Sequence, residues 1–223
     1  MAARFITFEG GEGCGKSTQL RLLSASMKAA GIAHITTREP GGTPLGEELR
    51  ELLVRQSDAD LSPETELLLF QAGRMAHLEQ VIRPALAEGK WVLCDRFTDS
   101  TRVYQGIGKR LGMSYIDRLQ ALTLGTFAPD ITLLLDIAPE AGLARAGNRK
   151  DGDTRFEELD IAFHQQVRDG FLALANAEPE RFIVVDAHPS VEEVHAAILT
   201  QLNTRLGIEC LQHSTRIVGD HVE

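Results

Sequence analysis

Residues 10–17 read Gly10-Gly11-Glu12-Gly13-Cys14-Gly15-Lys16-Ser17, which matches the GxxxxGK[ST] pattern of a phosphate-binding loop (P-loop). The pattern is specific for a P-loop only when it lies between a strand and a helix. Here the apolar run 5–8 precedes it and a helical pattern over 16–30 follows. Glycines let the backbone N–H groups of such a loop turn toward phosphate, and the helix N-terminus adds positive potential. The stretch therefore predicts a nucleotide site.

Within this loop, Lys16 is expected to pair the β- and γ-phosphate oxygens, and Ser17 to ligate Mg²⁺. Magnesium also takes a carboxylate from the end of a neighbouring strand. Asp95 closes the run 91–94 and is the candidate, with Asp136 as the fallback. The residues expected to bind ATP are Gly10, Gly11, Glu12, Gly13, Cys14, Gly15, Lys16, Ser17 and Thr18.

Three further apolar runs, over 91–94, 131–135 and 182–185, alternate with helical stretches. Their apolarity, like that of 5–8, is continuous rather than alternating, which is typical of parallel strands covered on both faces. A weaker fifth strand is expected over 33–37, after the first helix. Ser62-Pro63-Glu64 begins one of the helices with a Ser N-cap and a Pro at the first helical position. The pattern predicts an α/β P-loop NTPase fold, with a five-stranded parallel sheet flanked by helices on both faces. We expect one domain over 1–206 and leave the tail 207–223 unassigned.

The net charge of −9, from 23 basic against 32 acidic residues, argues against a nucleic-acid or membrane surface. There is no apolar run of about 20 residues and no signal-peptide pattern, so we expect a cytoplasmic protein. Cys14, Cys94 and Cys210 lack metal or disulfide spacing and are interpreted as free thiols.

A P-loop alone leaves the reaction open, because GTPases, helicases and transport ATPases share it. Three further segments place cations near the ligand edge: 38–42 (Arg-Glu-Pro-Gly-Gly), 95–97 (Asp-Arg-Phe) and an arginine-bearing stretch over 145–155. Transfer between two phosphorylated nucleotides requires such a set. Asp136 and Asp186 also end apolar runs, and for them we favour a role in capping the following turn.

Six segments together resemble the thymidylate kinase family in order and spacing, over residues 4 to 200. The resemblance implies ATP + dTMP = ADP + dTDP, with Mg²⁺, in a homodimer formed through helices on one side of the sheet. The segments are Phe8-Glu9-Gly10, Thr37-Arg38-Glu39-Pro40-Gly41-Gly42-Thr43, Asp95-Arg96, Tyr104-Gln105-Gly106, Pro129-Asp130 and Arg155-Phe156-Glu157.

The resemblance also assigns the dTMP site. Arg38 and Arg96 would hold the phosphate, and a guanidinium fork suits bidentate phosphate binding. Phe70 would stack on thymine and Arg74 would bond a base carbonyl. Without the resemblance, Phe70 would be assigned to an apolar helix face. Ser100, Thr101 and Gln105 would line the base, and Tyr104 the sugar.

Glu12 inside the P-loop would repel phosphate unless another group engages it. In family members with an acid here, that acid contacts the 3′-hydroxyl side of the deoxyribose, and the catalytic cation comes from a small lid, about residues 145–156. Arg149 is the residue expected to reach the transferred phosphoryl group, and Arg145 to contact ATP. The expected catalytic set is Lys16, Arg96, Arg149 and Glu12, with Lys150 and Arg155 nearby.

The chain departs from the family pattern at Thr154, where Asp is common, and in the segment 107–109 after Gln105-Gly106. Two alternatives stay open. One is a P-loop kinase for another nucleoside monophosphate or a deoxynucleoside. The other is a nucleotide-dependent regulatory switch, although the sequence has no Asn-Lys-x-Asp guanine-reading motif.

Overall fold

A computed structural model describes residues 2–55, 61–147, 155–209 and 211–212. Its sheet has the order β2-β3-β1-β4-β5, and every neighbouring pair is parallel. The predicted five-stranded parallel sheet is confirmed, with the weakest strand starting one residue later than expected. The strands are β1 (Phe5–Glu9), β2 (His34–Arg38), β3 (Trp91–Asp95), β4 (Ile131–Asp136) and β5 (Phe182–Asp186).

Helices connect the strands. The second predicted helix begins as expected, because the Ser62 side chain accepts from the Thr65 backbone N–H with Pro63 at the first position. An earlier helix, α2, was not predicted. The α-helices are α1 (Lys16–Ala29), α2 (Pro44–Arg50), α3 (Pro63–His77), α4 (Arg83–Ala87), α5 (Thr98–Thr101), α6 (Met113–Leu124), α7 (Pro139–Ala146), α8 (Ile161–Ala177) and α9 (Val191–Leu206), and the π-helical turns are η1 (Glu51–Arg55), η2 (Leu78–Ile82) and η3 (Arg102–Gly108).

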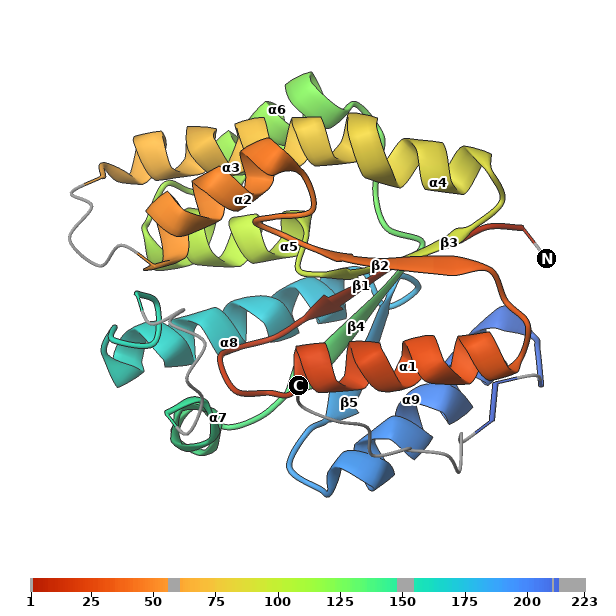
Figure 1. Ribbon diagram of the computed structural model, residues 1–223. Helices are drawn as coiled ribbons and strands as arrows, with labels where there is room; N and C mark the ends of the chain where they lie inside the picture. Colours follow the sequence, from red (N-terminus) through yellow and green to blue (C-terminus); the bar gives the residue numbers. More distant parts are fainter. Residues whose placement is uncertain (1, 56–60, 148–154, 210, 213–223) are drawn as a thin grey trace, which may run out of the picture.

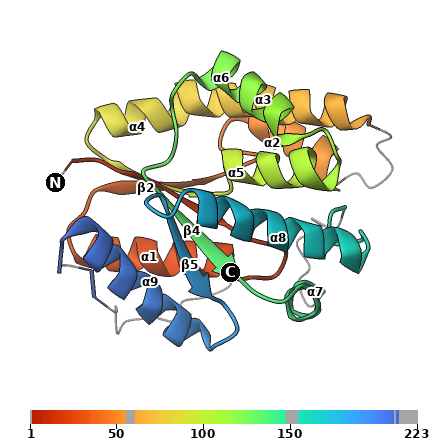
Figure 2. The ribbon, with the colours of Figure 1, turned by 180° about the vertical axis from the view of Figure 1, so that it is seen from behind.

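The sheet lies between two helical layers (Figures 1 and 2). Alternate strand residues point to opposite faces. In β1, Ile6 and Phe8 join the core beneath α1 and α9, whereas Phe5 joins the core beneath η2 and α4. A third cluster packs η3 and α8 against β4 and β5. Both faces of the central strands are therefore buried, which explains why their apolarity is continuous.

The five strands end at one edge of the sheet, and β1 lies in the middle, between β3 and β4. In doubly wound sheets this is where ligands bind, because the connections leave the edge in opposite directions. The segments that follow β1, β2 and β3 carry the predicted P-loop and two of the arginine segments. The fold therefore brings the P-loop and the two arginine segments to the same edge of the sheet.

The described part of the tail is attached to this core. Leu211 is buried, and its backbone bonds the Asn203 side chain through both N–H and C=O. Across the described ranges, no helix combines the length and apolarity needed to span a bilayer. Cys14 and Cys94 are free, as expected, and the structure buries both; Cys210 lies outside the described residues.

Candidate active site

The P-loop turns sharply from β1 into α1. Gly13 adopts φ +66°, and a Cβ there would lie 1.8 Å from the carbonyl oxygen of Gly142, so only glycine fits. The Lys16 ammonium folds back over the loop and donates to the carbonyl oxygens of Gly11 (2.8 Å) and Gly10 (3.2 Å). This cation is therefore held where the predicted phosphates would lie.

Ser17 and Asp95 meet at the start of α1. The Ser17 hydroxyl donates to Oδ2 of Asp95 at 2.8 Å, across the boundary between β1 and β3. Asp136, the fallback for magnesium, instead forms a bidentate pair with Arg168 at 2.7 and 2.9 Å. Its predicted role as a turn cap is wrong, because Arg168 takes both carboxylate oxygens. Asp186 does cap its turn, through the backbone N–H and ring of His188.

Arg96 and Glu12 form an ion pair at the rim of the P-loop, with Nη2 and Oε1 2.7 Å apart. The Tyr104 hydroxyl donates to the same oxygen at 2.8 Å. Glu12 is thus engaged by a cation and a hydroxyl, as the sequence argument required of a carboxylate in this loop. Arg96 has φ +67°. Its Nη1 donates to the Gly10 carbonyl and to the Ser100 hydroxyl. Such a strained backbone persists only where its surroundings hold it.

Electrostatics around Arg96 favour its charged form. Burial acts to lower the pKa of Arg96, but Glu12, Tyr104 and Asp95 more than offset it, so the pKa lies well above its ordinary value. Beneath it, Glu9 accepts from the backbone N–H groups of Phe97 and Ser100 at 2.8 and 3.2 Å and thereby holds the turn after β3. Burial, together with the nearby Asp99, raises the pKa of Glu9 to about 7.

Arg74 projects from α3 and is almost fully buried. Its Nε donates to Glu39 at 2.7 Å, Nη1 to Thr101 at 2.8 Å and Nη2 to the Phe97 carbonyl at 3.1 Å. His77, one turn along α3, holds the other oxygen of Glu39 at 2.9 Å. Arg38 is different, because its guanidinium is half exposed and pairs with Glu47 on α2. One arginine is thus fixed within the protein and the other reaches outward.

One cavity of about 270 Å³ lies at the carboxyl edge of the sheet. It joins the P-loop residues Lys16 and Ser17 to Arg38, Phe70 and Arg74. The sequence-predicted residues that line it are Glu12, Gly13, Gly15, Lys16, Ser17, Arg38, Phe70, Arg74, Asp95, Arg96, Ser100, Thr101, Tyr104 and Gln105.

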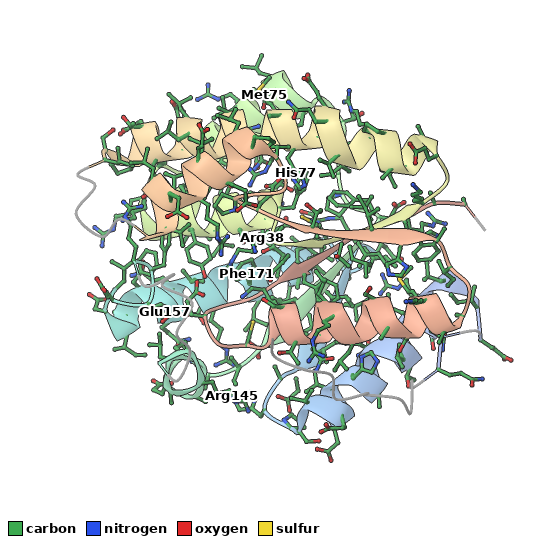
Figure 3. All side chains as sticks on the ribbon, viewed as in Figure 1. Arg38, Met75, His77, Arg145, Glu157 and Phe171 are labelled. Carbon is green, nitrogen blue, oxygen red and sulfur yellow. The ribbon has the colours of Figure 1, made fainter. Side chains whose placement is uncertain are left out.

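Other predicted residues lie elsewhere. Gly10 and Gly11 border a hollow of about 20 Å³ on the other side of the loop, while Cys14 is buried and Thr18 does not line the cavity. Arg145 turns to the carbonyl oxygens of Ala187 and His188 at 2.8 and 3.0 Å. Figure 3 shows it by α7, apart from Arg38. Arg149, Lys150 and Thr154 lie outside the described residues.

The lid stretch was expected to supply several cations to the site. Arg155 does not join the cavity, because it pairs with Glu66 at 2.8 Å and donates to the Leu53 carbonyl at 2.9 Å. Its neighbours Phe156 and Glu157 line the cavity instead, and Glu157 is labelled in Figure 3.

Several residues that line the cavity were given no role from the sequence. Glu39, Pro40, Phe156 and Glu157 stand inside the quoted motifs, so the motifs could have suggested them. Arg50 could have been found only by predicting α2, since that helix brings it to the cavity. The full set is Glu39, Pro40, Arg50, Val54, Phe97, Phe156 and Glu157.

Among the residues that the structure describes, no group of three or more His, Cys, Asp or Glu side chains is placed to hold a metal. The paired hydroxyl and carboxylate of Ser17 and Asp95 nevertheless suit a magnesium ion whose remaining ligands are phosphate oxygens and water.

Comparisons with known proteins point to the thymidylate kinase family. The family model described as thymidylate kinase matches residues 8–198. A thymidylate kinase of Magnetococcus marinus is 50% identical over 205 residues, which cover 92% of this chain and 98% of that protein. One of Caulobacter vibrioides is 51% identical over 204 residues, again 92% and 98%. The crystal structure of thymidylate kinase from Ehrlichia chaffeensis superposes with a TM-score of 0.75 at 35% identity, and covers 91% of this chain and all of that one.

Proposed function

This chain belongs to the thymidylate kinase family, and we infer that it is a phosphotransferase that carries the γ-phosphoryl group of ATP to dTMP, giving ADP and dTDP. The observation that carries this proposal is the shared cavity, in which Lys16 and Ser17 of the P-loop face Arg38, Arg74 and Arg96. A donor and an acceptor that are both anionic can meet only where cations neutralise them.

In the proposed mechanism, an oxygen of the dTMP phosphate attacks the γ-phosphorus in line with the leaving ADP oxygen. That oxygen is already ionised near neutral pH, so no general base is required. Lys16 holds the β- and γ-phosphates, and Arg96, fixed by Glu12, orients the acceptor phosphate. Arg38, which is half exposed and lines the same cavity, is proposed to bind the same phosphate. Catalysis then rests on alignment and charge neutralisation.

Mg²⁺ is part of this proposal, with Ser17 and Asp95 as the residues that would hold it. When bound, it would neutralise charge on the β- and γ-phosphate oxygens. Its support is the contact between a hydroxyl and a carboxylate at the start of α1, where the P-loop mechanism needs both. We propose Arg149 as the cation that reaches the transferred group and Arg145 as a contact to ATP, both on the family resemblance.

The nucleoside half of dTMP is proposed to bind at the far end of the cavity. Phe70 offers a ring for stacking, and Arg74 presents a fixed donor to a base carbonyl. Ser100, Thr101 and Gln105 complete this end. Tyr104 also lines the cavity, donates to Glu12 of the P-loop, and is proposed to contact the deoxyribose.

We also propose that the enzyme is a homodimer. Four large apolar side chains are exposed on the layer formed by α3 and α6, namely Leu68, Met75, Tyr115 and Leu122, and Leu122 is 85% exposed. Figure 3 shows Met75 on the outer side of this layer, away from the sheet. Neighbouring exposed apolar groups mark interaction surfaces. A cytoplasmic location stays a prediction from the sequence.

The experiment that tests the function measures ADP formation from ATP with dTMP, dUMP, dCMP and thymidine compared side by side. Fastest turnover with dTMP is expected. Faster turnover with another acceptor would support the kinase alternative, and ATP hydrolysis unaffected by any acceptor would support the nucleotide switch. Lys16→Ala should remove nearly all turnover while circular dichroism shows an intact fold.

A further inference from the structure

Glu66 is a buried carboxylate that the proposed reaction does not use. It projects from α3, is 1% exposed, and has a different partner on each oxygen. Oε1 accepts from Nε2 of Gln105 at 2.8 Å, and Oε2 pairs with Nη1 of Arg155 at 2.8 Å. A carboxylate buried this deeply is costly unless it is fully paired. Its position beside the base end of the cavity therefore calls for an explanation.

Arg155 fixes the carboxylate from outside the cavity. The same Nη1 donates to the Leu53 carbonyl at 2.9 Å, and the Arg155 backbone N–H points to the Val54 carbonyl at 3.4 Å. These contacts anchor Arg155 to η1. A guanidinium keeps its charge at every accessible pH and only donates hydrogen bonds. Glu66 is thus held as an acceptor on both oxygens.

The contact with Glu66 sets the direction of the Gln105 amide. A carboxylate can only accept, so the amide must turn its nitrogen toward Glu66, and the oxygen becomes its other end. Gln105 lines the cavity and is itself 2% exposed. Within the described ranges, its side-chain oxygen has no protein partner. The amide therefore offers the cavity an acceptor.

Arg74 offers the complementary group. Its Nε, both Nη1 hydrogens and one Nη2 hydrogen are directed to Glu39, Gln71, Thr101 and Phe97. A guanidinium carries five N–H groups, so one Nη2 hydrogen remains on a side chain that lines the cavity. The base end of the cavity thus presents one fixed donor and one fixed acceptor.

Pyrimidine bases differ in this pattern. Thymine and uracil carry an acceptor at O4 beside a donor at N3–H, whereas cytosine carries a donor at N4 beside an acceptor at N3. A donor from Arg74 and an acceptor from Gln105 match the first pair and oppose the second. A site built this way rejects the wrong base because its buried polar groups would be left unpaired.

We propose that Glu66, held by Arg155, is a specificity-determining positioning residue: it locks the Gln105 amide so that the site accepts 4-oxopyrimidine monophosphates and rejects the 4-amino base of dCMP. The inference rests on the proposed function and extends it to a residue that does not touch substrate.

The test compares kcat/KM for dTMP, dUMP and dCMP in the wild type and in Glu66→Gln. Arg155 only donates, so the new amide keeps its oxygen toward Arg155 and turns its nitrogen toward Gln105. The Gln105 oxygen then accepts from that nitrogen, and the Gln105 nitrogen faces the cavity as a donor that matches N3 of cytosine. The ratio of dTMP to dCMP should fall about tenfold or more. The ratio of dTMP to dUMP should stay unchanged, because both bases share the same edge. A dTMP to dCMP ratio equal to that of the wild type overturns the proposal.

Asp99→Asn is the matched control. Asp99 is also 1% exposed and paired with an arginine, Arg181, at 2.6 Å, but it does not line the cavity. Asp99→Asn should lower the melting temperature and leave the dTMP to dCMP and dTMP to dUMP ratios unchanged. An equal fall of the dTMP to dCMP ratio in this control would show a general effect of instability and would overturn the assignment to Glu66.

A second measurement covers the case in which Glu66→Gln does not fold. A crystal structure of the wild-type protein with dTMP should place the Gln105 amide within hydrogen-bond distance of N3. A base whose N3 faces any other group overturns the proposal. The proposed function is tested separately. A wild-type protein that does not phosphorylate dTMP would contradict the function itself. An active wild type whose dTMP to dCMP ratio is unchanged in Glu66→Gln would contradict only the inference about Glu66.

Discussion

Arg96 and Glu12 lie 2.7 Å apart, so the carboxylate that interrupts the P-loop is paired with a cation that we assign to the acceptor phosphate. The pair links two segments 84 residues apart in the sequence. It explains how a phosphate site tolerates an acid among its glycines. It also makes Arg96 the first residue whose removal should be tested.

Arg96→Ala should reduce kcat with dTMP by about 100-fold to 1,000-fold, the usual cost of removing a charged group that stabilises a transition state. The variant also leaves Glu12 unpaired beside the phosphates. Arg4→Ala is the control, because it breaks an exposed ion pair with Asp130 at the start of β1. Steady-state kinetics measure both, and near-normal turnover of Arg96→Ala would contradict the assignment.

Asp95→Asn should raise the Mg²⁺ concentration for half-maximal activity by about tenfold or more, because a ligand charge is lost. Combining it with Ser17→Ala should cost less than the sum of the single changes, since the two side chains share a hydrogen bond. Chelation of Mg²⁺ should stop turnover. Asp136→Asn, which disturbs only the pair with Arg168, should keep the wild-type Mg²⁺ dependence; a shift there instead would move the metal site to Asp136.

The raised pKa of Glu9 predicts that the stability of the fold depends on pH. Because burial and Asp99 raise its pKa from 4.5 to about 7, the folded state binds this proton more tightly than the unfolded chain does. Its stabilising contribution is therefore complete below about pH 4.5 and is lost as the pH rises to about 7. Glu9→Gln cannot lose that proton. Its melting temperature, measured from pH 5 to 8, should gain on that of the wild type as the pH rises, and parallel curves would rule this out.

Gly42→Ala should destabilise the fold by about 2–4 kcal/mol. Gly42 has φ +76°, and a Cβ would lie 2.6 Å from both the His77 ring and the Thr37 hydroxyl. The left-handed backbone costs about 1–2 kcal/mol and the overpacking a similar amount. Gly31→Ala separates the two effects, because Gly31 has φ +70° with open space around it. Urea unfolding should show a clearly smaller loss for Gly31→Ala, and equal losses would argue against the steric contribution.

Leu122→Glu should convert the proposed dimer to a monomer, because a charge would then stand at the most exposed apolar position of α6. Val184→Glu is the control for the dimer surface, because it makes the same change at an exposed apolar residue of β5. This strand is the last of the sheet and lies on the far side of the molecule from α6 (Figure 1). Sedimentation velocity measures both. A wild-type chain that sediments as a monomer would remove the dimer from the proposal.

The strands and the P-loop could be predicted from sequence because their signals are local. An apolar run of four or five residues, a Ser-Pro helix start and glycines with positive φ each depend on near neighbours in the chain. Helix α2 gave a weaker signal: seven residues with a Thr43 N-cap, placed between a glycine turn and η1. Because it was missed, the position of Arg50 on the cavity could not be predicted.

Partners distant in the sequence could not be predicted from residue type. Asp136 and Asp186 both follow strands, yet one pairs with Arg168 from α8 and the other caps its own turn. Arg145 and Arg155 both belong to the basic stretch, but the first binds backbone carbonyls after β5 and the second binds Glu66. Which acceptor an arginine meets depends on which helix packs beside it.

The sequence by itself determined the sheet, the phosphate loop and the set of arginines available to a second anion. Only the tertiary structure decided that Arg38, Arg74 and Arg96 face Lys16 across one cavity while Arg155 turns away to hold Glu66. The physical reason is the range of the interactions. Backbone conformation and periodicity are set within a few residues, whereas the pairing of a buried charge is set by whichever groups the folded chain brings within about 3 Å.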